Sequence, residues 1–451
     1  MLRRWSITLL ALLLLVSSAA FAAEPMAENT VETALLRGDF AALLVEAAGL
    51  EGEGSPADVL IQHGIMNGVP GKNADAGRPI KRVEAAALLG RTIGISDGVM
   101  PPPDADITLP PSHWAYGSYA WLTRLGLVAG DPEAVLSPDE GAWLVKYAFE
   151  PTTEDVLAIL EQSQQQSLAE EASRLQVALD GKIQLIPRPG VEGAEEIQSS
   201  LTPELHVLQT MVLPDKIHQL TTMKIGLAGL DAEEIVSESY IVAGGMYQQL
   251  PDPETGETRW YKYPAEMMPD MEQLIEQAQQ QAQVIPAGLE KTTFYKLLGT
   301  KECNGKQVYE LSFYSRIDDI PDFLSKALSN FGGDELLTEA LSAAGNMVDT
   351  LSIWGLSSIN VDDHLPHQTT IGMTLTLAEE FLGEAIPLQA IEFLLTSGEY
   401  RYGEEIEIVV PGEVLAAPEY EFPGLDFDQE FDLDELDLET PEELELEPGL
   451  Q

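Results

Sequence analysis

Two arginines and a tryptophan in the first third of the chain have side chains suited to binding an acidic sugar. Trp114 lies in the run Pro111-Ser112-His113-Trp114-Ala115-Tyr116, and the flat face of an indole ring can stack on a sugar ring. Arg82 and Arg37 both stand at expected helix starts, and a guanidinium can make two parallel hydrogen bonds to a carboxylate. These residues predict a glycan-binding site, with Arg82 as the first candidate and Arg37 as the second.

Three further residues complete the candidate site. Asp106 and His113 can hydrogen-bond to sugar hydroxyls, and Gly130 lets a ligand approach the backbone closely. A simpler interpretation stays open, in which Trp114 and Trp121 share one core-facing stripe and Arg82 belongs to a solvated helix start. Positive charge also gathers here, in a chain otherwise short of cations, at Lys72, Arg78, Lys81 and Arg82.

Catalytic and metal-binding patterns are missing from the sequence. It has no His-Glu-x-x-His, no Gly-x-Ser-x-Gly and no glycine-rich phosphate loop. His364 and His367 could bind a metal, but no third or fourth ligand is apparent, so we interpret them as two exposed histidines on a turn. We therefore expect no catalytic residue, no metal, no cofactor and no enzymatic activity. The remaining enzymatic alternative is an acid pair that hydrolyses glycosides, because 75 acidic residues form pairs by chance.

Charge and the N-terminus limit the partners and the location. The formal net charge of −51 argues against nucleic acid as a partner, because binding it relies on neutralising phosphates with lysine and arginine. Residues 1–22 have the pattern of a secretory signal peptide, with Arg3 and Arg4 before an apolar run and Ala20-Phe21-Ala22 at its end. No later stretch is apolar and long enough for a membrane helix. We therefore expect a secreted protein of the cell wall or cell surface.

The candidate residues lie in a region of repeats, residues 24–150. The segment 79–89 predicts a helix start, and 37–44 is a weaker copy of it. Residues 59–68 parallel 119–130 in the same way. A third helix start, Gly141-Ala142-Trp143-Leu144-Val145, has lost the arginine and the glutamate. We expect two full helix-loop-helix repeats and a closing helix, which together form an all-α region.

One ordered set of motifs in this region is specific. It consists of His113-Trp114-Ala115, the turn Gly130-Asp131-Pro132-Glu133 and the segment Leu136-Ser137-Pro138-Asp139-Glu140. In these motifs the region resembles S-layer homology repeats. The resemblance implies three repeats packed as a pseudo-threefold bundle that holds an exported protein non-covalently to a secondary cell-wall polysaccharide, often a pyruvylated and anionic one. The first and last copies depart from the family pattern, and Lys81 stands where the family usually has threonine.

The rest of the chain predicts a linker and an α+β domain. Residues 151–175 are interpreted as a solvated helical linker rich in glutamine. In residues 176–418, helices at 267–284 and 321–344 interrupt the strands, and Asn304-Gly305 indicates a hairpin because both residues tolerate positive φ. This order favours a curved antiparallel sheet with helices on its concave face. Strands are expected at 205–211, 216–225, 239–243, 246–250, 259–263, 294–302, 307–313, 350–361, 367–376, 391–395 and 405–410.

The strand-rich region contains a series of turn and strand signatures. They are Trp260-Tyr261-Lys262, Tyr295-Lys296-Leu297-Leu298-Gly299, Gly305-Lys306, Asp363-His364-Leu365-Pro366, Tyr402-Gly403-Glu404-Glu405-Ile406 and Val410-Pro411. In these signatures the region resembles the half-barrels of lipoprotein-carrier proteins, a group that includes envelope proteins of unknown function. The resemblance implies an apolar cavity between sheet and helices that holds an acyl chain or another lipid. The alternative is that the apolar side chains only fill a core. Methionine adapts to irregular apolar shapes, and the region carries Met211, Met223, Met246, Met267, Met268, Met271 and Met373.

The sequence as a whole predicts a multidomain, non-catalytic protein of the cell envelope. Residues 419–451 alternate acidic and apolar residues without a lysine or arginine, which favours a disordered acidic tail. The repeats would anchor the protein to wall polysaccharide, and the second domain would bind a lipid or another apolar ligand. Three alternatives stay open: a purely structural component with no small ligand, repeats that bind protein instead of glycan, and an enzyme that acts on wall glycan.

Overall fold

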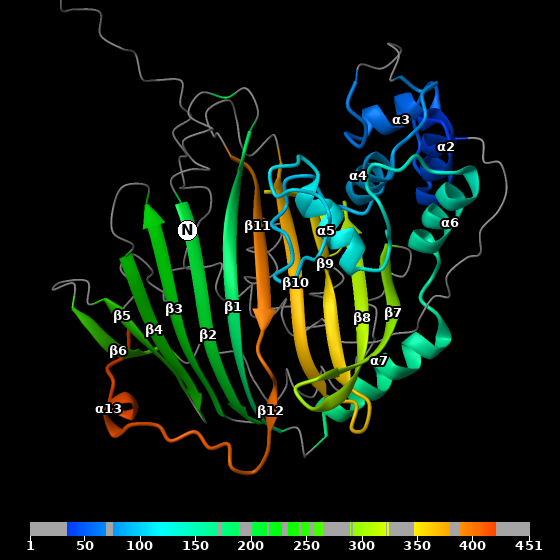
Figure 1. Ribbon diagram of the computed structural model, residues 1–451. Coiled ribbons are helices and arrows are strands. Elements are labelled where there is room, and N and C mark those ends of the chain that lie inside the picture. Colours follow the sequence, from blue (N-terminus) through cyan, green and yellow to red (C-terminus); the bar gives the residue numbers. More distant parts are fainter. Residues whose placement is uncertain are drawn as a thin grey trace, which may run out of the picture.

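An antiparallel sheet with a layer of helices forms the described part of the protein (Figure 1). The computed structural model describes residues 34–68, 75–169, 173–188, 191, 201–213, 216–227, 233–242, 245–251, 257–264, 289, 292–321, 323, 347–378 and 388–420. The expected signal peptide and nearly all of the expected acidic tail lie outside these residues. So does the expected helix at 267–284, together with most of the one at 321–344.

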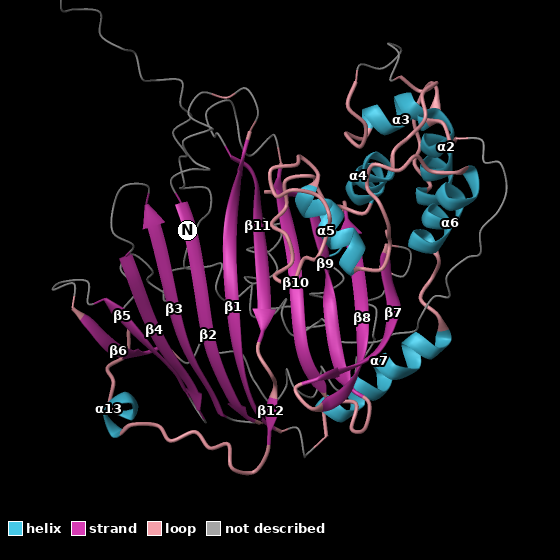
Figure 2. Ribbon diagram, viewed as in Figure 1, coloured by secondary structure: helices cyan, strands magenta, loops and turns pink. Residues whose placement is uncertain are grey.

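Within the described residues the sheet contains twelve strands, and Figure 2 shows them side by side. Its order is β6-β5-β4-β3-β2-β1-β11-β10-β9-β8-β7, and β12 also pairs with β1. Two antiparallel meanders, β1 to β6 and β7 to β11, meet where β1 pairs with β11. The strands are β1 (Arg174–Pro187), β2 (Leu201–Val212), β3 (Lys216–Leu227), β4 (Glu233–Val242), β5 (Gly245–Pro251), β6 (Thr258–Lys262), β7 (Thr293–Cys303), β8 (Lys306–Ile317), β9 (Val348–Asn360), β10 (Pro366–Leu377), β11 (Leu388–Ser397) and β12 (Arg401–Tyr402).

The helices come mostly from the first third of the chain. Figure 1 shows α2 to α6 gathered at one end of the β7–β11 meander, with α5 crossing β9 and β10. The described helices are α2 (Arg37–Ala48), α3 (Pro56–Gln62), α4 (Arg82–Thr92), α5 (Tyr116–Arg124), α6 (Pro138–Phe149), α7 (Glu154–Ser167) and α13 (Gly412–Leu415). None of them is long and apolar enough to cross a membrane.

The expected fold class is wrong. The sequence predicts an all-α repeat region followed by an α+β domain, whereas the described chain is dominated by one large antiparallel sheet on which the helices pack. The reason lies in the sheet face that meets the helices, where the large side chains of Phe294, Tyr314 and Trp354 are buried. Helices and sheet cover each other's apolar surface, so they share one core.

The hairpin signal is confirmed, and two other local expectations are not. Asn304 and Gly305 adopt φ of 49° and 80° in the turn between β7 and β8, where Cys303 pairs with Lys306. The segment 405–410 forms no strand. The long strand β1, at the centre of the sheet, lies almost entirely in the first residues of the expected α+β domain, ahead of the first strand that the sequence predicts.

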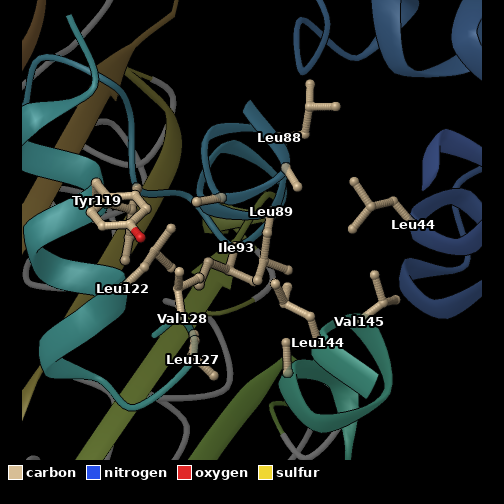
Figure 3. Packing of buried hydrophobic residues seen from close by; sticks show 14 of the residues in the cluster. Leu44, Leu88, Leu89, Ile93, Tyr119, Leu122, Leu127, Val128, Leu144 and Val145 are labelled. Carbon is tan, nitrogen blue, oxygen red and sulfur yellow. The ribbon is translucent and has the colours of Figure 1, made fainter. Parts of the chain in front are cut away.

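The shared core gathers residues from α2 to α6 and from the sheet. Figure 3 shows Leu44 of α2, Leu89 of α4, Leu122 of α5 and Leu144 of α6 converging. The same cluster continues into the sheet at Phe294, Tyr314, Trp354, Leu356 and Leu394. Two edge-to-face ring pairs join the layers, Trp121 with Trp354 at a centroid distance of 6.1 Å and Phe149 with Phe294 at 5.9 Å.

Strand β8 also donates hydrogen bonds to the C-terminal ends of three different helices. Alternate residues of a strand point to the same face, and Ser312, Tyr314 and Arg316 all point toward the helices. Ser312 Oγ donates to the carbonyl oxygen of Leu125 after α5 (2.9 Å), and Arg316 Nη1 to that of Arg91 in α4 (3.1 Å). The Tyr314 hydroxyl donates to the carbonyl oxygen of Ala148 in α6. One strand therefore supplies side-chain donors to backbone carbonyls at the ends of three helices.

The opposite face of the sheet is covered in part by α7. Val156, Ile159 and Leu160 of α7 are buried in a second cluster with side chains such as Phe313 and Ile359. The helix expected to be a solvated linker is therefore packed on the sheet. The helix is rich in glutamine and has few apolar residues. Those few lie on one face of the helix, and they are enough to pack that face on the sheet.

A carboxyl group is buried at the contact between the helices and the sheet. Glu392 of β11 is 1% exposed, its Oε1 accepts the Met100 N–H at 2.7 Å, and its Oε2 has no partner among the described residues. Burial raises the pKa of Glu392 to about 8, although the Met100 hydrogen bond acts in the opposite direction.

Replacing Tyr314 with phenylalanine tests the contribution of the helix-end hydrogen bonds. We expect Tyr314→Phe to lower the free energy of unfolding by about 1–2 kcal/mol, because the Ala148 carbonyl loses its buried donor. Chemical denaturation followed by tryptophan fluorescence measures this. Tyr309→Phe is the matched control, and an equal loss in both variants would contradict the assignment.

Replacing Glu392 with glutamine tests the buried carboxyl. Between the ordinary pKa of 4.5 and the folded value of about 8, the folded chain keeps a proton that the unfolded chain has released. Stability from this group is therefore greatest at low pH and falls as pH rises through that interval. We expect Glu392→Gln to match the native chain near pH 4.5 and to exceed it above pH 8, by on the order of a few kcal/mol. Equal pH profiles of unfolding for the two proteins would count against this account, and exposed Glu407→Gln is the control.

Candidate functional site

Three segments that precede helices are joined in a closed ring of backbone hydrogen bonds. The Leu35 N–H donates to the Leu136 carbonyl oxygen (2.8 Å), the Leu136 N–H to Ile80 (3.1 Å), and the Ile80 N–H to Leu35 (2.9 Å). These residues lie just before α2, α4 and α6. The ring therefore places the N-terminal ends of the three helices in equivalent positions around one centre.

The helices that follow α2 and α4 also end in equivalent ways. The N–H groups of Ile65 and Met66 both donate to the carbonyl oxygen of Leu60, as those of Leu127 and Val128 do to Leu122. The glycines in these turns have φ of 66° at position 64 and 72° at position 126. This equivalence gives two helix pairs, α2 with α3 and α4 with α5, and α6 as a further helix in the ring.

Arg82 and Gly130, both predicted site residues, lie together at the start of α4. Arg82 Nη1 donates to the carbonyl oxygen of Asp131 and Nη2 to Glu140 Oε1, both at 2.8 Å. Gly130 has φ of 98°, and a Cβ there would lie 3.1 Å from Arg82 Nη1. The Tyr119 hydroxyl donates to the Gly130 carbonyl oxygen (3.0 Å). We call these five residues the Arg82 site.

Arg37 occupies the equivalent place at the start of α2. Its backbone N–H donates to the Arg78 carbonyl oxygen (2.9 Å), as that of Arg82 does to Ala134 (2.8 Å). By this correspondence Glu84 matches Glu140, since each is the third residue of its helix and its carboxylate accepts the backbone N–H of the N-cap residue. We call Arg37, Asp75, Arg78 and Glu84 the Arg37 site.

The two sites differ in which cation holds the glutamate. In the Arg37 site, Nη1 and Nη2 of Arg78 donate to the two carboxylate oxygens of Glu84 at 2.7 and 2.6 Å. Arg78 Nε also pairs with Asp75 at 3.1 Å. No hydrogen bond or ion pair joins the Arg37 side chain to any described residue, and its Nε is buried without a partner. Burial and the neighbouring Arg78 charge lower the pKa of Arg37.

The expected island of positive charge is largely neutralised. Lys81 Nζ lies 2.6 Å from Glu133 Oε2, and Arg78 and Arg82 are paired with Glu84 and Glu140. The fourth member, Lys72, lies outside the described residues. Arg37 is thus the cation of these two sites that has no acidic partner in the described structure.

The other predicted residues lie apart from the two arginines. Trp114 is 50% exposed, whereas Trp121 is buried, so the two do not share a core-facing stripe. The His113 and Trp114 rings are 5.4 Å apart, and His113 Nδ1 accepts the Ala115 N–H. Asp106 is exposed. No described contact links Asp106, His113 or Trp114 to Arg82 or Arg37.

Sequence reasoning missed the partners of the arginines. Glu140 was detectable, because Ser137 and Glu140 have the Ser-x-x-Glu spacing of a capping box, which the structure contains. The bond from Tyr119 to Gly130 has no local signal. The Arg78–Glu84 pair was visible only as two nearby charges, and their spacing does not reveal that Arg37 is left unpaired.

The expectation of two exposed histidines is wrong for His367. His367 is fully buried, both of its ring nitrogens lack a partner in the described structure, and burial lowers its pKa. His364 lies in the preceding turn with φ of 57°. Among the described residues, no three His, Cys, Asp or Glu side chains gather as a metal ion would require.

The sheet face opposite α2 to α6 carries a continuous apolar row. Strand register aligns Ile371 of β10 with Leu395 of β11, and then Gly181 of β1 with Leu205 of β2. The row continues through Met223 and Ile235, and Ile235 is 46% exposed. A Cβ at Gly181 would lie 2.9 Å from Leu395 Cδ2 and 3.2 Å from Leu205 Cβ, so these side chains close over the glycine.

Comparison with known proteins places the chain in a family. Residues 194–419, half of the chain, match the family described as a family of unknown function (DUF6612), and the chain belongs to it. No curated protein matches the chain.

Several solved structures are similar to the strand-rich part. Lipoprotein LppX from Mycobacterium tuberculosis is 9% identical, with a TM-score of 0.23, over 56% of this chain and 97% of that one. LprF from Mycobacterium bovis is 10% identical, with a TM-score of 0.28, over 58% and 99%. A putative outer membrane lipoprotein-sorting protein domain from Vibrio parahaemolyticus is 10% identical, with a TM-score of 0.19, over 55% and 93%. At these identities and TM-scores the likenesses assign no function.

A stability comparison tests the different states of the two arginines. We expect Arg82→Gln to cost about 1–3 kcal/mol of unfolding free energy, because it breaks a partly buried charged hydrogen bond to Glu140. Arg37→Gln should change stability by less than about 0.5 kcal/mol, because it removes a cation that has no acidic partner among the described residues. Thermal and urea unfolding at low salt measure both, and a larger loss in Arg37→Gln would contradict the assignment.

Proposed function

We propose that this protein is a non-catalytic, exported component of the cell envelope that binds an anionic cell-wall polysaccharide at the Arg37 site. The observation that carries the proposal is the Arg37 guanidinium, which makes no hydrogen bond or ion pair to any described residue and whose Nε is buried, in a site whose counterpart is filled. A guanidinium keeps its charge at any physiological pH. A partly buried cation without an acidic partner gains free energy when an anionic ligand supplies one.

The Arg82 site indicates which chemical group such a position accepts. There the Glu140 carboxylate and the Asp131 carbonyl oxygen bind the guanidinium. In the Arg37 site the equivalent glutamate is bound by Arg78 instead. We infer that a carboxylate from outside the chain binds Arg37, as a carboxylate of the chain binds Arg82. Arg37 therefore becomes the first candidate for glycan binding and Arg82 the second, because the guanidinium of Arg82 is already bound to Glu140.

A pyruvylated wall polysaccharide offers both the carboxylate and the sugar rings. The resemblance to S-layer homology repeats and the ring of three helix starts support this partner. The exposed Trp114 ring provides a stacking surface, and Asp106 and His113 are the proposed partners of sugar hydroxyls. In this proposal the mature protein lies outside the cell, at the wall.

A second proposal concerns the apolar row of the sheet, from Ile371 to Ile235. Its side chains present apolar surface on a face that is only partly buried at Leu205, Met223 and Ile235. Burying such a surface against an apolar ligand is favourable by about 25 cal/mol per Å². We propose that this face binds a lipid or another apolar molecule while the helices hold the protein at the wall.

Co-sedimentation with native cell-wall sacculi tests the first proposal. We expect Arg37→Gln to reduce the bound fraction at least tenfold, and Arg82→Gln to reduce it much less at a temperature where both variants are folded. Removing the wall polysaccharide should abolish binding of the native chain. Equal binding of the native chain and Arg37→Gln, or retention on stripped wall, would contradict the proposal and favour a protein partner.

Native mass spectrometry of the purified protein tests the second proposal. We expect a co-purifying lipid that is lost in Met223→Lys, because a charge on the apolar row opposes an acyl chain. Thr222→Lys, at the next position of β3 and on the other face, is the matched control. A ligand-free native protein, or equal lipid content in both variants, would contradict it.

A further inference from the structure

A cleft of about 620 Å³ opens where the C-terminal end of α2 faces the sheet. Ala47 and Ala48 of α2 line one side, and Phe294 of β7 and Thr350 of β9 line another. The Arg37 site lies at the N-terminal end of the same helix. The cleft is therefore a separate place on the molecule, and it plays no part in the functions proposed above.

The floor of the cleft is aromatic. Phe149, Phe294 and Tyr314 line it, with Phe294 edge-to-face against Phe149 and stacked on Tyr314 at a centroid distance of 5.4 Å. The Tyr314 hydroxyl is already bound to the Ala148 carbonyl oxygen. Tyr314 is fully buried beneath Phe294, so the apolar surface open to a ligand comes mainly from the half-buried Phe149 and the edge of Phe294, without a hydroxyl donor.

The rim of the cleft is acidic. Asp318 and Asp349 both line it, and Thr350 Oγ1 lies 3.3 Å from an oxygen of each. The one arginine of the lining, Arg316, is committed elsewhere: its Nε donates to Asp318 at 2.9 Å, and its Nη1 donates to the Arg91 carbonyl oxygen. No described ion pair engages Asp349, so the rim keeps an uncompensated carboxylate.

The end of a helix adds to the attraction of the cleft for a cation. The last residues of α2 line the cleft, and the C-terminal end of a helix carries partial negative charge. His63, also in the lining, is held in place by its Nε2, which donates to the Glu51 carbonyl oxygen at 2.9 Å.

We infer that this cleft binds a small organic cation, an amine attached to an aromatic or compact apolar body. The amine would lie near Asp349 and the end of α2, and the apolar body would pack on Phe149 and Phe294. Cations are attracted to aromatic faces as well as to carboxylates. The volume lies within the range of about 300–1,000 Å³ that is typical of small-molecule sites. The two carboxylates of the rim oppose an anionic ligand.

Titration of the full mature chain with three matched probes tests this inference. The probes are phenethylammonium, its neutral counterpart 2-phenylethanol and the anion phenylacetate, followed by ligand-observed NMR at low salt. We expect phenethylammonium to bind at least tenfold more tightly than either of the others. Asp349→Asn should weaken its binding at least fivefold.

The control variant separates the cleft from the general negative charge of the chain. Asp362→Asn removes an exposed acid in the β9–β10 turn, outside the lining of the cleft, and should leave binding unchanged. Equal weakening by the two variants would overturn the inference, because it would show non-specific attraction. Binding of phenylacetate as tight as that of phenethylammonium, or no binding of phenethylammonium at 10 mM, would also overturn it.

Discussion

The contact between the ends of the helices and strand β8 is the constraint on which the rest of the structure depends. Ser312, Tyr314 and Arg316 each donate to the end of a different helix, so one strand fixes α4, α5 and α6 together. The rings of Trp121 and Trp354 pack beside these bonds. The hydrogen bonds and the burial of apolar side chains therefore stabilise the same contact between helices and sheet. A buried carbonyl left without a donor there would lower the free energy of unfolding.

This contact determines which ends of the helices remain free for binding. Because the C-terminal ends of α4, α5 and α6 face the sheet, the N-terminal ends that form the backbone ring are held away from these contacts. The ring places Arg37 and Arg82 in equivalent surroundings, and one change of partner separates them: Arg78 takes Glu84, whereas Glu140 stays with Arg82. The repeated helix starts thus hold one arginine that is paired with a glutamate, Arg82, and one that has no acidic partner among the described residues, Arg37.

The same contact leaves the end of α2 without a partner from β8. The cleft lies between the C-terminal end of α2 and residues of β8 and β9 such as Arg316 and Thr350. On the other face of the sheet, α7 covers the β7–β11 meander, while the apolar row continues onto β1 to β4. The three proposed sites therefore lie on different parts of the molecule.

Local features of the structure were predictable, and long-range ones were not. The turn at Asn304-Gly305 follows from the tolerance of both residues for positive φ. The strand β1 was missed although Leu175, Val177 and Leu179 alternate with polar residues such as Gln176, as expected of a strand with one apolar face. Its central place in the sheet depends on pairing with β11, which lies far away in sequence and leaves no local signal. The fold class was predicted wrongly because the helical repeats look like an independent domain in the sequence. Nothing in their own residues shows that their core includes Trp354 of the sheet.

For the candidate site, too, local features were predictable from the sequence and long-range contacts were not. Arg82 and Gly130 were predicted together from motif spacing, and the structure brings them together. The pairing that leaves Arg37 open depends on the competition of Arg78 and Arg37 for one glutamate, which requires distances that spacing does not supply.

Native-state hydrogen exchange in increasing urea tests most directly whether helices and sheet form one cooperative unit. Peptides from α4, α5 and α6 should open with the same free energy and the same urea dependence as peptides from β8 and β9. If the helices exchange through an opening of clearly lower free energy while β8 and β9 stay protected, the shared core does not hold the two layers together. In that case the helical repeats fold independently of the sheet.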